Sequence, residues 1–534
     1  MKGVQLPGTV LFALFLNAWS DNADNASTVM ITGICACVIV YLAFKHLLAS
    51  FRVQTTRTVI VLLSVWVCLE AVLGLLQNYG VAASNHRLYQ LTGSFLNPNP
   101  YAGFLVVSCS VLAAYHYQHP DENGCIKALI MASLILSAVV LPATRCRAAF
   151  CSGAAVLGLM LWKRPAVRHF MVSNAKLVIT VLLVFSGLLY VWKKPSADWR
   201  MFQDKISVIT IVQNPMRGCG LGRYGGAASR TQACYFKERL ELNDGNVVIP
   251  ALIRAECRKA GWSPYAFCDP LQIGAEAGVP AMLAFLLLVA VSLMVLHRKD
   301  SPFFYGALAM QIISLFCYTV QLWQNELLLM IMLAESASYA PVSRRSALMD
   351  CGLTVVSVLM LCHCVPAWTA IKKETAAWER DRFFYDTGHY ELYCRYCDDR
   401  LCHLDCNDDF MLEYGLALHH AGDIEKSDSV LRAGFDYSGN PAFRIALGDN
   451  RLLKGDYAAA RECYWNAFCC IPDRLLPISR LAVLYKAEGR IDCLSNLIRF
   501  ARGFKMRIES DVTERIRQEM TQMDQIPVSF FLKN

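Results

Sequence analysis

The stretch Leu271–Leu296, LQIGAEAGVPAMLAFLLLVAVSLMVL, holds a single charged side chain, Glu276. An α-helix rises about 1.5 Å per residue, so a run of this length crosses the roughly 30 Å hydrocarbon core of a bilayer. Similar apolar blocks recur on both sides of it, which predicts an all-α polytopic membrane protein. We expect about eleven transmembrane helices, at residues 6–19, 29–49, 58–77, 101–117, 125–142, 147–162, 176–192, 271–296, 302–320, 322–340 and 351–368.

The composition agrees with this prediction. The chain has 534 residues, of which 55% are hydrophobic and only 18% are charged, and its mean hydropathy is +0.35. These values argue against a purely soluble enzyme, a disordered chain, a collagen and a small disulfide scaffold. The net charge of +8 indicates loop topology in a membrane protein, so we expect no nucleic-acid partner.

Basic residues are shared unevenly between the loops that join the predicted helices. The short loops on one side carry only Arg87, Arg145 and Arg147. By the positive-inside rule, the N-terminus is cytoplasmic, and the loop 193–270 and everything after about residue 370 lie outside the cytoplasm. The inner loops then carry twelve basic residues: Lys45, Arg52, Arg57, Lys127, Lys163, Arg164, Arg168, Lys176, Arg298, Lys299, Arg344 and Arg345.

The first apolar block has an alternative interpretation as a signal peptide. Met1-Lys2 precedes a short apolar run, and Ala18-Trp19-Ser20 resembles a cleavage site. The charge pattern favours a membrane span, because the basic residues fall on the cytoplasmic side only if this block crosses the membrane. The predicted domains are transmembrane helices at 1–192 (about seven), a large outward loop at 193–270, transmembrane helices at 271–372 (about four), an outward helical-repeat domain at 373–510 and a tail at 511–534.

The C-terminal region repeats with a period of about 34 residues, the length of a tetratricopeptide helical hairpin. Gly415 and Gly422 recur as Gly448 and Gly455, and again as Ala482 and Gly489. We therefore expect an α-solenoid of three tetratricopeptide-like repeats and a degenerate first copy. Such arrays commonly bind a protein partner on their concave surface, and a spacer or stabilising cap is the alternative.

Four cysteines, Cys394, Cys397, Cys402 and Cys406, stand close together among the 23 in the chain. Their spacing fits a zinc site, a pair of disulfides, or thiols that pack on one helix face. The repeat register puts all four in one helix of the degenerate hairpin, which favours packing.

Candidate functional residues gather in the outward loops. Arg145 and Arg147 lie between two predicted spans, where guanidinium groups suit a phosphate ligand; snorkelling to lipid headgroups is the alternative. Arg200 opens the long loop, and Asn214 precedes three alternating glycines that form either an anion-binding nest or a turn: Gly218, Gly220 and Gly222.

The segment Gly93-Ser-Phe-Leu-Asn-Pro-Asn-Pro-Tyr-Ala102 leads from another outward loop directly into a span. Asn97, Asn99 and Tyr101 offer polar groups there for sugar hydroxyls, and two prolines stiffen the segment. A turn that caps the next helix is the alternative interpretation.

Taken together, these segments resemble the superfamily of O-antigen ligases and O-antigen polymerases, in the subgroup with a C-terminal tetratricopeptide domain. The likeness covers nearly the whole chain. It is carried by the order and placement of Gly93–Ala102, Thr144-Arg-Cys-Arg147, Arg200, Asn214-Pro215 with Gly218-x-Gly220-x-Gly222, and Leu271-Gln272-Ile-Gly-Ala-Glu276-Ala-Gly278.

The resemblance implies a GT-C-like membrane glycosyltransferase in the bacterial inner membrane, with its active site and C-terminal domain in the periplasm. The donor would be a glycan linked to undecaprenyl diphosphate, and the acceptor lipid A core, another glycan or a protein. Arg147 and Arg200 would bind the diphosphate, and Arg145, Asn97, Asn99, Tyr101, Asn214, the three glycines, Gln272 and Glu276 would contact substrate. The resemblance implies no metal and no cofactor.

Two adjacent positions depart from the family pattern. Ligases of this family often carry a histidine and an asparagine before the Leu-Gln pair, where this chain has Phe267 and Cys268. We therefore assign Asp269 as the residue that activates or orients the acceptor hydroxyl, with a helix-capping role as the alternative.

The sequence leaves other functions open. A polymerase would share the donor and the fold. A non-enzymatic scaffold would use the repeat domain alone, and a flippase would move the lipid-linked glycan without forming a new bond.

Overall fold

The computed structural model describes residues 5–20, 25–86, 88–192, 194–341, 343–507 and 509–523. Arg87, which was counted among the outward basic residues, lies outside the described residues, as does the end of the predicted tail. The chain divides into two compact units. The apolar unit comprises Met1–Asn17, Ile31–Ala197 and Ala266–Cys362, and the polar unit comprises Ala18–Met30, Asp198–Tyr265 and His363–Asn534.

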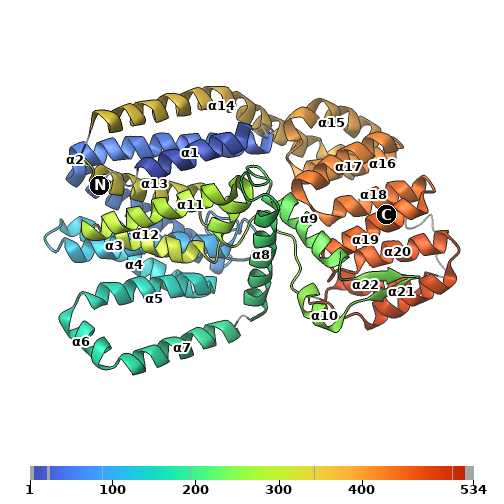
Figure 1. The fold of residues 1–534 in the computed structure, drawn as a ribbon, viewed down its shortest axis with the longest axis horizontal. Coiled ribbons are helices and arrows are strands. Elements are labelled where there is room, and N and C mark those ends of the chain that lie inside the picture. Colours follow the sequence, from blue (N-terminus) through green and yellow to red (C-terminus); the bar gives the residue numbers. More distant parts are fainter. Residues whose placement is uncertain are drawn as a thin grey trace. The chain divides into compact units, whose positions relative to one another are not determined.

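The helices wholly or mainly in the apolar unit match the predicted apolar blocks (Figure 1). They are α1 (Gln5–Ser20), α2 (Asn25–Asn78), α3 (Pro98–Gln118), α4 (Gly124–Thr144), α5 (Arg147–Trp162), α6 (Pro165–Ser173), α7 (Ala175–Trp192), α11 (Asp269–Arg298), α12 (Phe303–Ser314), α13 (Trp323–Ser338) and α14 (Arg344–Asp386), which continues into the polar unit.

The described residues include four helices that are long and apolar enough to cross a membrane, namely α2, α4, α11 and α14. A fifth is added if α6 and the first part of α7, which meet at 85°, form one broken span. Large apolar side chains such as Leu62, Ile135 and Leu359 are more than half exposed on these helices, which suits lipid rather than water. The chain therefore has the features of a membrane protein, and the count of eleven spans stays a prediction.

Helix α2 is a hairpin rather than one straight rod. Phe51 has non-helical angles (φ −136°, ψ 50°), and Thr55 donates its hydroxyl proton to the carbonyl of Leu47 at 3.3 Å. In a straight helix, residues eight positions apart are separated by about 12 Å. The expected loop between the second and third spans is thus reduced to a sharp bend at Phe51. The prediction of a loop here was wrong because only this one residue leaves the helical conformation.

Helix α13 contacts both arms of this hairpin. The Cys37 thiol lies 3.8 Å from the Glu326 carboxylate near the start of α13, and Arg52 binds Glu335 near its end. The second arm then returns to the start of α13, where Trp66 stacks on Trp323. The two arms are therefore antiparallel, as two separate membrane spans would be.

The polar unit is built from helices and one hairpin of strands. Asp244 and Gly245, both with positive φ, join the two strands, so the all-α prediction misses this small element. The elements are α8 (Lys194–Gln213), α9 (Tyr224–Lys237), β1 (Glu241–Asn243), β2 (Asn246–Val248), α10 (Ala251–Cys257), α15 (Tyr390–Leu404), α16 (Asp408–Ala421), α17 (Ile424–Ser438), α18 (Pro441–Leu453), α19 (Tyr457–Cys470), α20 (Leu476–Ala487), α21 (Ile491–Gly503) and α22 (Asp511–Thr521).

Helices α15 to α21 pack in sequence, each against the next. Gly415 lies against Leu431 and Gly448 lies against Tyr464, with no room for a Cβ atom at either glycine. The repeated small residues thus allow the close helix packing that the 34-residue period predicts. The tetratricopeptide assignment itself stays a prediction. Helix α22 packs on α20 and α21, so the part of the predicted tail up to Thr521 is folded.

The long polar loop does not stand apart from the repeat region. Helix α9 packs against α17 and α19 (Figure 1). Gly226 contacts the carbonyl oxygen of Tyr437, and Ser229 donates a hydrogen bond to the carbonyl of Gly439. Residues 198–265 of the predicted loop therefore share one compact unit with the predicted repeat domain 373–510.

Candidate functional site

The predicted site segments of the apolar unit meet at one end of its helices. We call this the loop end; it contains residues 66–78, 91–101, 144–147, 266–278 and 315–326. The opposite end, called the ion-pair end, contains the following cation–carboxylate pairs among the described residues: Lys45–Asp350, Arg52–Glu335, Arg57–Glu122 and Lys163–Asp300. Basic residues counted as inward, such as Lys45, Arg52 and Arg57, lie at the ion-pair end. Arg145 and Arg147 lie at the loop end, so the two sets of basic residues are at opposite ends of the helices.

The segment Thr92–Ser94 is fixed to the second arm of α2 by two buried side chains. Glu70 accepts hydrogen bonds from the Ser94 N–H at 3.0 Å and from the Ser94 hydroxyl at 2.5 Å. Gln77 accepts from the N–H groups of Thr92 at 2.9 Å and Gly93 at 2.7 Å. Sequence reasoning missed both residues, although a carboxylate and an amide inside a predicted span are themselves a warning of a special role.

Tyr101 is not placed to contact substrate. Its side chain is 0% exposed, and its hydroxyl donates to the carbonyl of Glu70 at 2.8 Å. The ring fills the space beside Gly74 and Gly93, where a Cβ atom would collide with it. Tyr101 therefore shapes the loop, which corrects its assignment as a substrate-binding residue.

Asn97 and Asn99 sit where α3 begins. The Asn97 side chain is the N-cap and accepts a hydrogen bond from the N–H of Asn99 at 3.0 Å. The capping interpretation is therefore confirmed for Asn97. Asn99 is half-buried in the first turn, and its carbonyl lies 3.9 Å from the Cys146 sulfur, which brings the α3 start beside the 144–147 segment.

Arg145 and Arg147 form the break between α4 and α5. Arg145 is exposed and left-handed (φ 51°), which is costly for a residue with a side chain. Arg147 is the first residue of α5, whose N-cap Cys146 makes no side-chain capping bond. A cation at a helix N-terminus is disfavoured by about 0.3–1 kcal/mol, whereas an anion is favoured. Arg147 donates a long hydrogen bond, 3.5 Å, to the carbonyl of Tyr190.

Asp269 lies at the start of α11 but does not cap it. The N-cap is Cys268, without a side-chain bond, so the capping interpretation was wrong. Asp269 is 0% exposed, and its Oδ2 accepts the N–H groups of Thr319 at 3.0 Å and Val320 at 3.1 Å. Its other oxygen has no partner among the described residues. The carboxylate therefore holds the turn that precedes α13.

Gln272 and Glu276 are also buried, and the two side chains take part in hydrogen bonds within the protein. Gln272 accepts the Ala266 N–H at 2.6 Å and donates to Glu276 at 2.7 Å. Two residues later Gly278 interrupts α11 with φ 86° and ψ 169°, a conformation that is essentially restricted to glycine. Gln272 and Glu276 were predicted to contact substrate. Their hydrogen bonds instead link the backbone at Ala266 to the part of α11 just before the bend at Gly278.

Aromatic rings link these segments into one structure. Phe95 contacts Phe104, Phe104 contacts Trp66, and Trp66 stacks on Trp323 at 5.6 Å. Just after Trp323, the Asn325 side chain is 0% exposed and has no hydrogen-bond partner among the described residues. Buried amides nearly always have a hydrogen-bond partner, so Asn325 stands out as a candidate for a ligand or water contact. Sequence reasoning missed it because one asparagine in an apolar block gives no pattern.

The remaining predicted residues belong to the polar unit, so they are described separately. Arg200 and Asp204 lie one turn apart on α8. Burial raises the pKa of the Asp204 carboxyl to about 6, although the positive charge of Arg200 acts in the opposite direction. Asp198 lies 3.8 Å from Lys259. The head of the long loop thus carries a cation beside an acid that titrates near neutrality.

The glycine segment after α8 forms a tight turn. Gly218, Gly220 and Gly222 all have positive φ, at 71°, 101° and 73°. Gly218 donates its N–H to the carbonyl of the exposed Asn214 at 2.9 Å. The turn alternative is therefore confirmed, and the anion-binding alternative stays a prediction.

The cysteine cluster does not act as one group. Cys394 and Cys397 are buried in the core of the polar unit, while Cys402 is exposed. Cys406 lies beyond the end of α15, which corrects its placement in that helix. Among the described residues, no group of three or more histidines, cysteines and acids is arranged to hold a metal ion. Packing explains the first two thiols.

Neither a protein-family model nor a curated protein matches the chain.

Proposed function

We propose that the protein is a membrane glycosyltransferase of the O-antigen ligase type. In this proposal about eleven spans form a GT-C-like fold in the bacterial inner membrane, and a tetratricopeptide-like domain stands in the periplasm. The enzyme transfers a glycan from undecaprenyl diphosphate to an acceptor, either lipid A core or a protein. The sequence resemblance suggests the donor class, and the contacts at the loop end support a site there.

The observation that carries the proposal is the convergence of three motif segments at the loop end. Hydrogen bonds of Glu70, Gln77 and Asp269 fix the loops, and the Arg145–Arg147 break supplies guanidinium groups at the N-terminus of α5. A rigid cationic site stabilises charge that develops on a diphosphate leaving group more effectively than water does.

In the proposed reaction, the acceptor oxygen forms a bond to the anomeric carbon while the bond from that carbon to the diphosphate oxygen breaks. The electron pair goes to the diphosphate, which Arg147 and Arg145 bind, and the sequence resemblance implies the same role for Arg200. The acceptor proton passes to a base or to solvent. Because Asp269 is fully buried and binds Thr319 and Val320, we assign it as a positioning residue and no longer as the base.

The test is deletion of the gene in its host, followed by complementation and gel analysis of envelope glycans. Wild type, Arg147→Ala and Arg200→Ala are expressed at equal levels, with Arg168→Ala as the control because Arg168 is an exposed arginine away from the loop end. Accumulated long lipid-linked glycan in the deletion strain, rescued by wild type and Arg168→Ala only, supports a ligase.

Other outcomes contradict the proposal in distinct ways. Single repeat units on the acceptor would indicate a polymerase. Full rescue by both Arg147→Ala and Arg200→Ala would indicate a scaffold. Loss of glycan transport without loss of transfer would indicate a flippase.

A further inference from the structure

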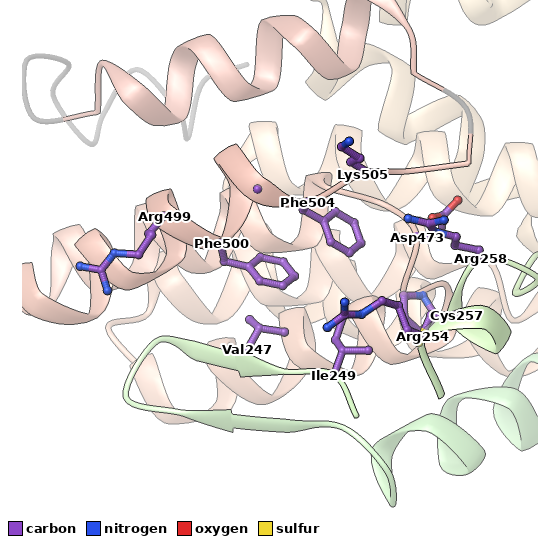
Figure 2. Close-up of a pocket in the computed structure, with 12 residues that line it drawn as sticks. Val247, Ile249, Arg254, Cys257, Arg258, Asp473, Arg499, Phe500, Phe504 and Lys505 are labelled. Atoms are coloured by element: carbon purple, nitrogen blue, oxygen red, sulfur yellow. The ribbon is translucent and has the colours of Figure 1, made fainter. Parts of the chain in front are cut away.

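A cavity of about 420 Å³ lies in the polar unit, and none of the predicted site residues is among those that line it (Figure 2). One wall comes from the end of the β-hairpin and from α10, and the other comes from the end of α21 and the residues that follow it. Its volume falls in the range of about 300–1,000 Å³ that is typical of small-molecule sites.

Four cationic side chains line this cavity: Arg254, Arg258, Arg499 and Lys505. Among the residues that the structure describes, none of the four makes an ion pair. The single carboxylate in the lining is Asp473, and both of its oxygens accept the N–H of Arg507, at 3.0 and 3.2 Å. The described lining therefore carries four cationic side chains against one carboxylate, which is an excess of positive charge.

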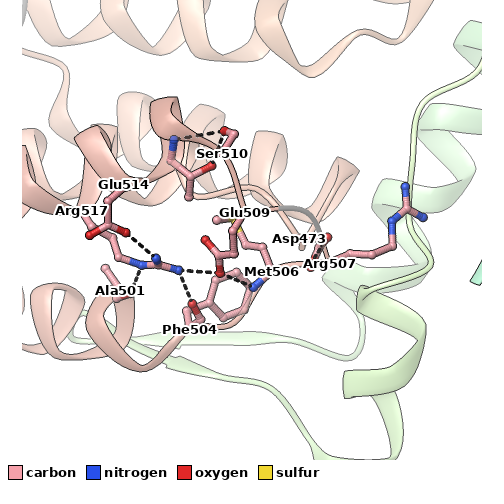
Figure 3. Close-up of polar contacts among 10 residues, drawn as sticks. Asp473, Ala501, Phe504, Met506, Arg507, Glu509, Ser510, Glu514 and Arg517 are labelled. Atoms are coloured by element: carbon pink, nitrogen blue, oxygen red, sulfur yellow. Dashed lines mark hydrogen bonds and ion pairs between the residues drawn. The ribbon is translucent and has the colours of Figure 1, made fainter. Parts of the chain in front are cut away.

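The neighbouring acids are already engaged with other groups. Glu256 on α10 binds Lys205 at 2.8 Å and the Tyr235 hydroxyl at 2.5 Å. Glu509 and Glu514 bind Arg517, at 2.9 and 3.0 Å (Figure 3). These pairs engage the neighbouring glutamates, so Asp473, whose charge interacts with that of Arg258, is the carboxylate of the described lining with which an entering anion competes.

The apolar part of the lining is held in place by its neighbours. Phe500 and Phe504 stack with ring centroids 4.9 Å apart and an interplanar angle of 28°, and Figure 2 shows both rings facing Val247 and Ile249. Arg517 donates to the carbonyl of Phe504 at 2.8 Å, which fixes the segment that carries Phe504 and Lys505 (Figure 3). The site is thus organised before a ligand arrives.

We propose that this cavity binds an acidic saccharide, with its phosphate or carboxylate on the arginines and its ring face on the phenyl pair. Guanidinium groups offer paired N–H donors that match the oxygens of such anions. The C–H face of a sugar ring is apolar and suits an aromatic surface, whereas a small inorganic anion leaves that surface uncovered. This inference does not depend on the proposed transferase activity.

The test measures binding to the purified full-length protein in detergent. The probes are glucose 6-phosphate, inorganic phosphate and glucose, each titrated at low salt and at high salt. We expect saturable binding of glucose 6-phosphate that is at least tenfold tighter than that of either other probe and that weakens as salt increases.

Two double variants separate the two halves of the site. Arg254→Gln/Arg258→Gln should weaken glucose 6-phosphate binding at least tenfold, and Phe500→Leu/Phe504→Leu should reduce its advantage over inorganic phosphate. Arg515→Gln, an exposed arginine of α22 outside the cavity, should change nothing. Lys505→Gln, in an exposed loop position, gives a milder charge change if a double variant fails to fold.

Three results would overturn the proposal. They are no saturable binding of glucose 6-phosphate at millimolar concentration, equal affinity for inorganic phosphate, or unchanged binding in folded Arg254→Gln/Arg258→Gln and Lys505→Gln proteins. None of these results bears on glycan transfer, which the complementation experiment tests separately.

Discussion

The two ends of the apolar unit use their carboxylates in opposite ways. At the ion-pair end, acids accept hydrogen bonds from cations, as Asp350 does from Lys45 at 2.5 Å. At the loop end, Glu70 and Asp269 accept hydrogen bonds from backbone N–H groups of loops. The first arrangement joins helices to one another, and the second fixes the shape of loops.

This difference has a consequence for function. Where an acid pairs with a cation, little positive charge is left to bind an anionic ligand. Glu70 and Asp269 instead accept hydrogen bonds from backbone N–H groups of the loops. The loop end can therefore combine ordered loops with guanidinium groups. The ion-pair end is expected to serve stability only.

The largest expected effect is on stability, at the ion-pair end. Lys45→Met leaves Asp350 buried without its closest cation, and breaking such a pair costs about 3–5 kcal/mol of unfolding free energy. Adding Asp350→Asn should recover most of the loss. Denaturant titration in detergent measures both, with the exposed Lys176→Met expected to stay within about 0.5 kcal/mol of wild type. An equal loss in the single and double variants would contradict the pairing.

The second effect concerns the bend in α11 at the loop end. Gly278→Ala forces a side chain into φ 86°, ψ 169°, which should cost about 1–3 kcal/mol. Gly33→Ala in α2 is the matched control, because nothing lies within 4 Å of its Cβ position and alanine favours a helix. The same denaturant titration should show loss in the first variant and no loss in the second. No loss in Gly278→Ala would show that the bend is not strained.

The third effect tests whether Glu70 shapes the loop. Glu70→Gln removes the charge from two hydrogen bonds to Ser94, which should cost about 1–2 kcal/mol. Hydrogen exchange should rise in a peptide covering residues 88–101 and stay unchanged in one covering residues 335–341. A uniform increase across both peptides would indicate general destabilisation and contradict a local role.

The smallest effect is a pH dependence in the polar unit. Because the pKa of Asp204 is raised to about 6 from 3.8, the folded state holds the proton more tightly than the unfolded state. The favourable contribution of neutral Asp204 is then fully present below about pH 3.8 and is lost as pH rises through 6. Asp204→Asn should match wild type at low pH and exceed its melting temperature above pH 7. A constant difference at every pH would contradict the shift.

The sequence predicted the helices of the apolar unit well because each apolar block is long and nearly free of charge. It placed a chain reversal between residues 49 and 58 but did not predict that the reversal is confined to Phe51, since no glycine or proline marks that residue. It missed Glu70 and Gln77, since single polar residues in an apolar run show no periodicity. Tyr101 was misassigned because a hydroxyl in a loop motif looks available until its burial is known.

The packing of α9 on the repeat helices was also beyond the sequence. The contacts join Ser229 to Gly439 and Gly226 to Tyr437, more than 200 residues apart. Small residues that allow close approach look the same whether they face another helix or solvent. Only the fold reveals that the long loop and the repeat region are one unit.

The most direct measurement of the central claim is glycan transfer by purified protein from an undecaprenyl-diphosphate-linked donor. Arg147→Ala at the loop end is compared with Arg168→Ala, after both are shown to be folded. We predict that Arg147→Ala lowers the transfer rate by about 10²–10³, as expected for loss of one preorganised charge donor, and that Arg168→Ala leaves it unchanged. Equal rates for the two variants, or no transfer by the wild-type protein, would contradict the account.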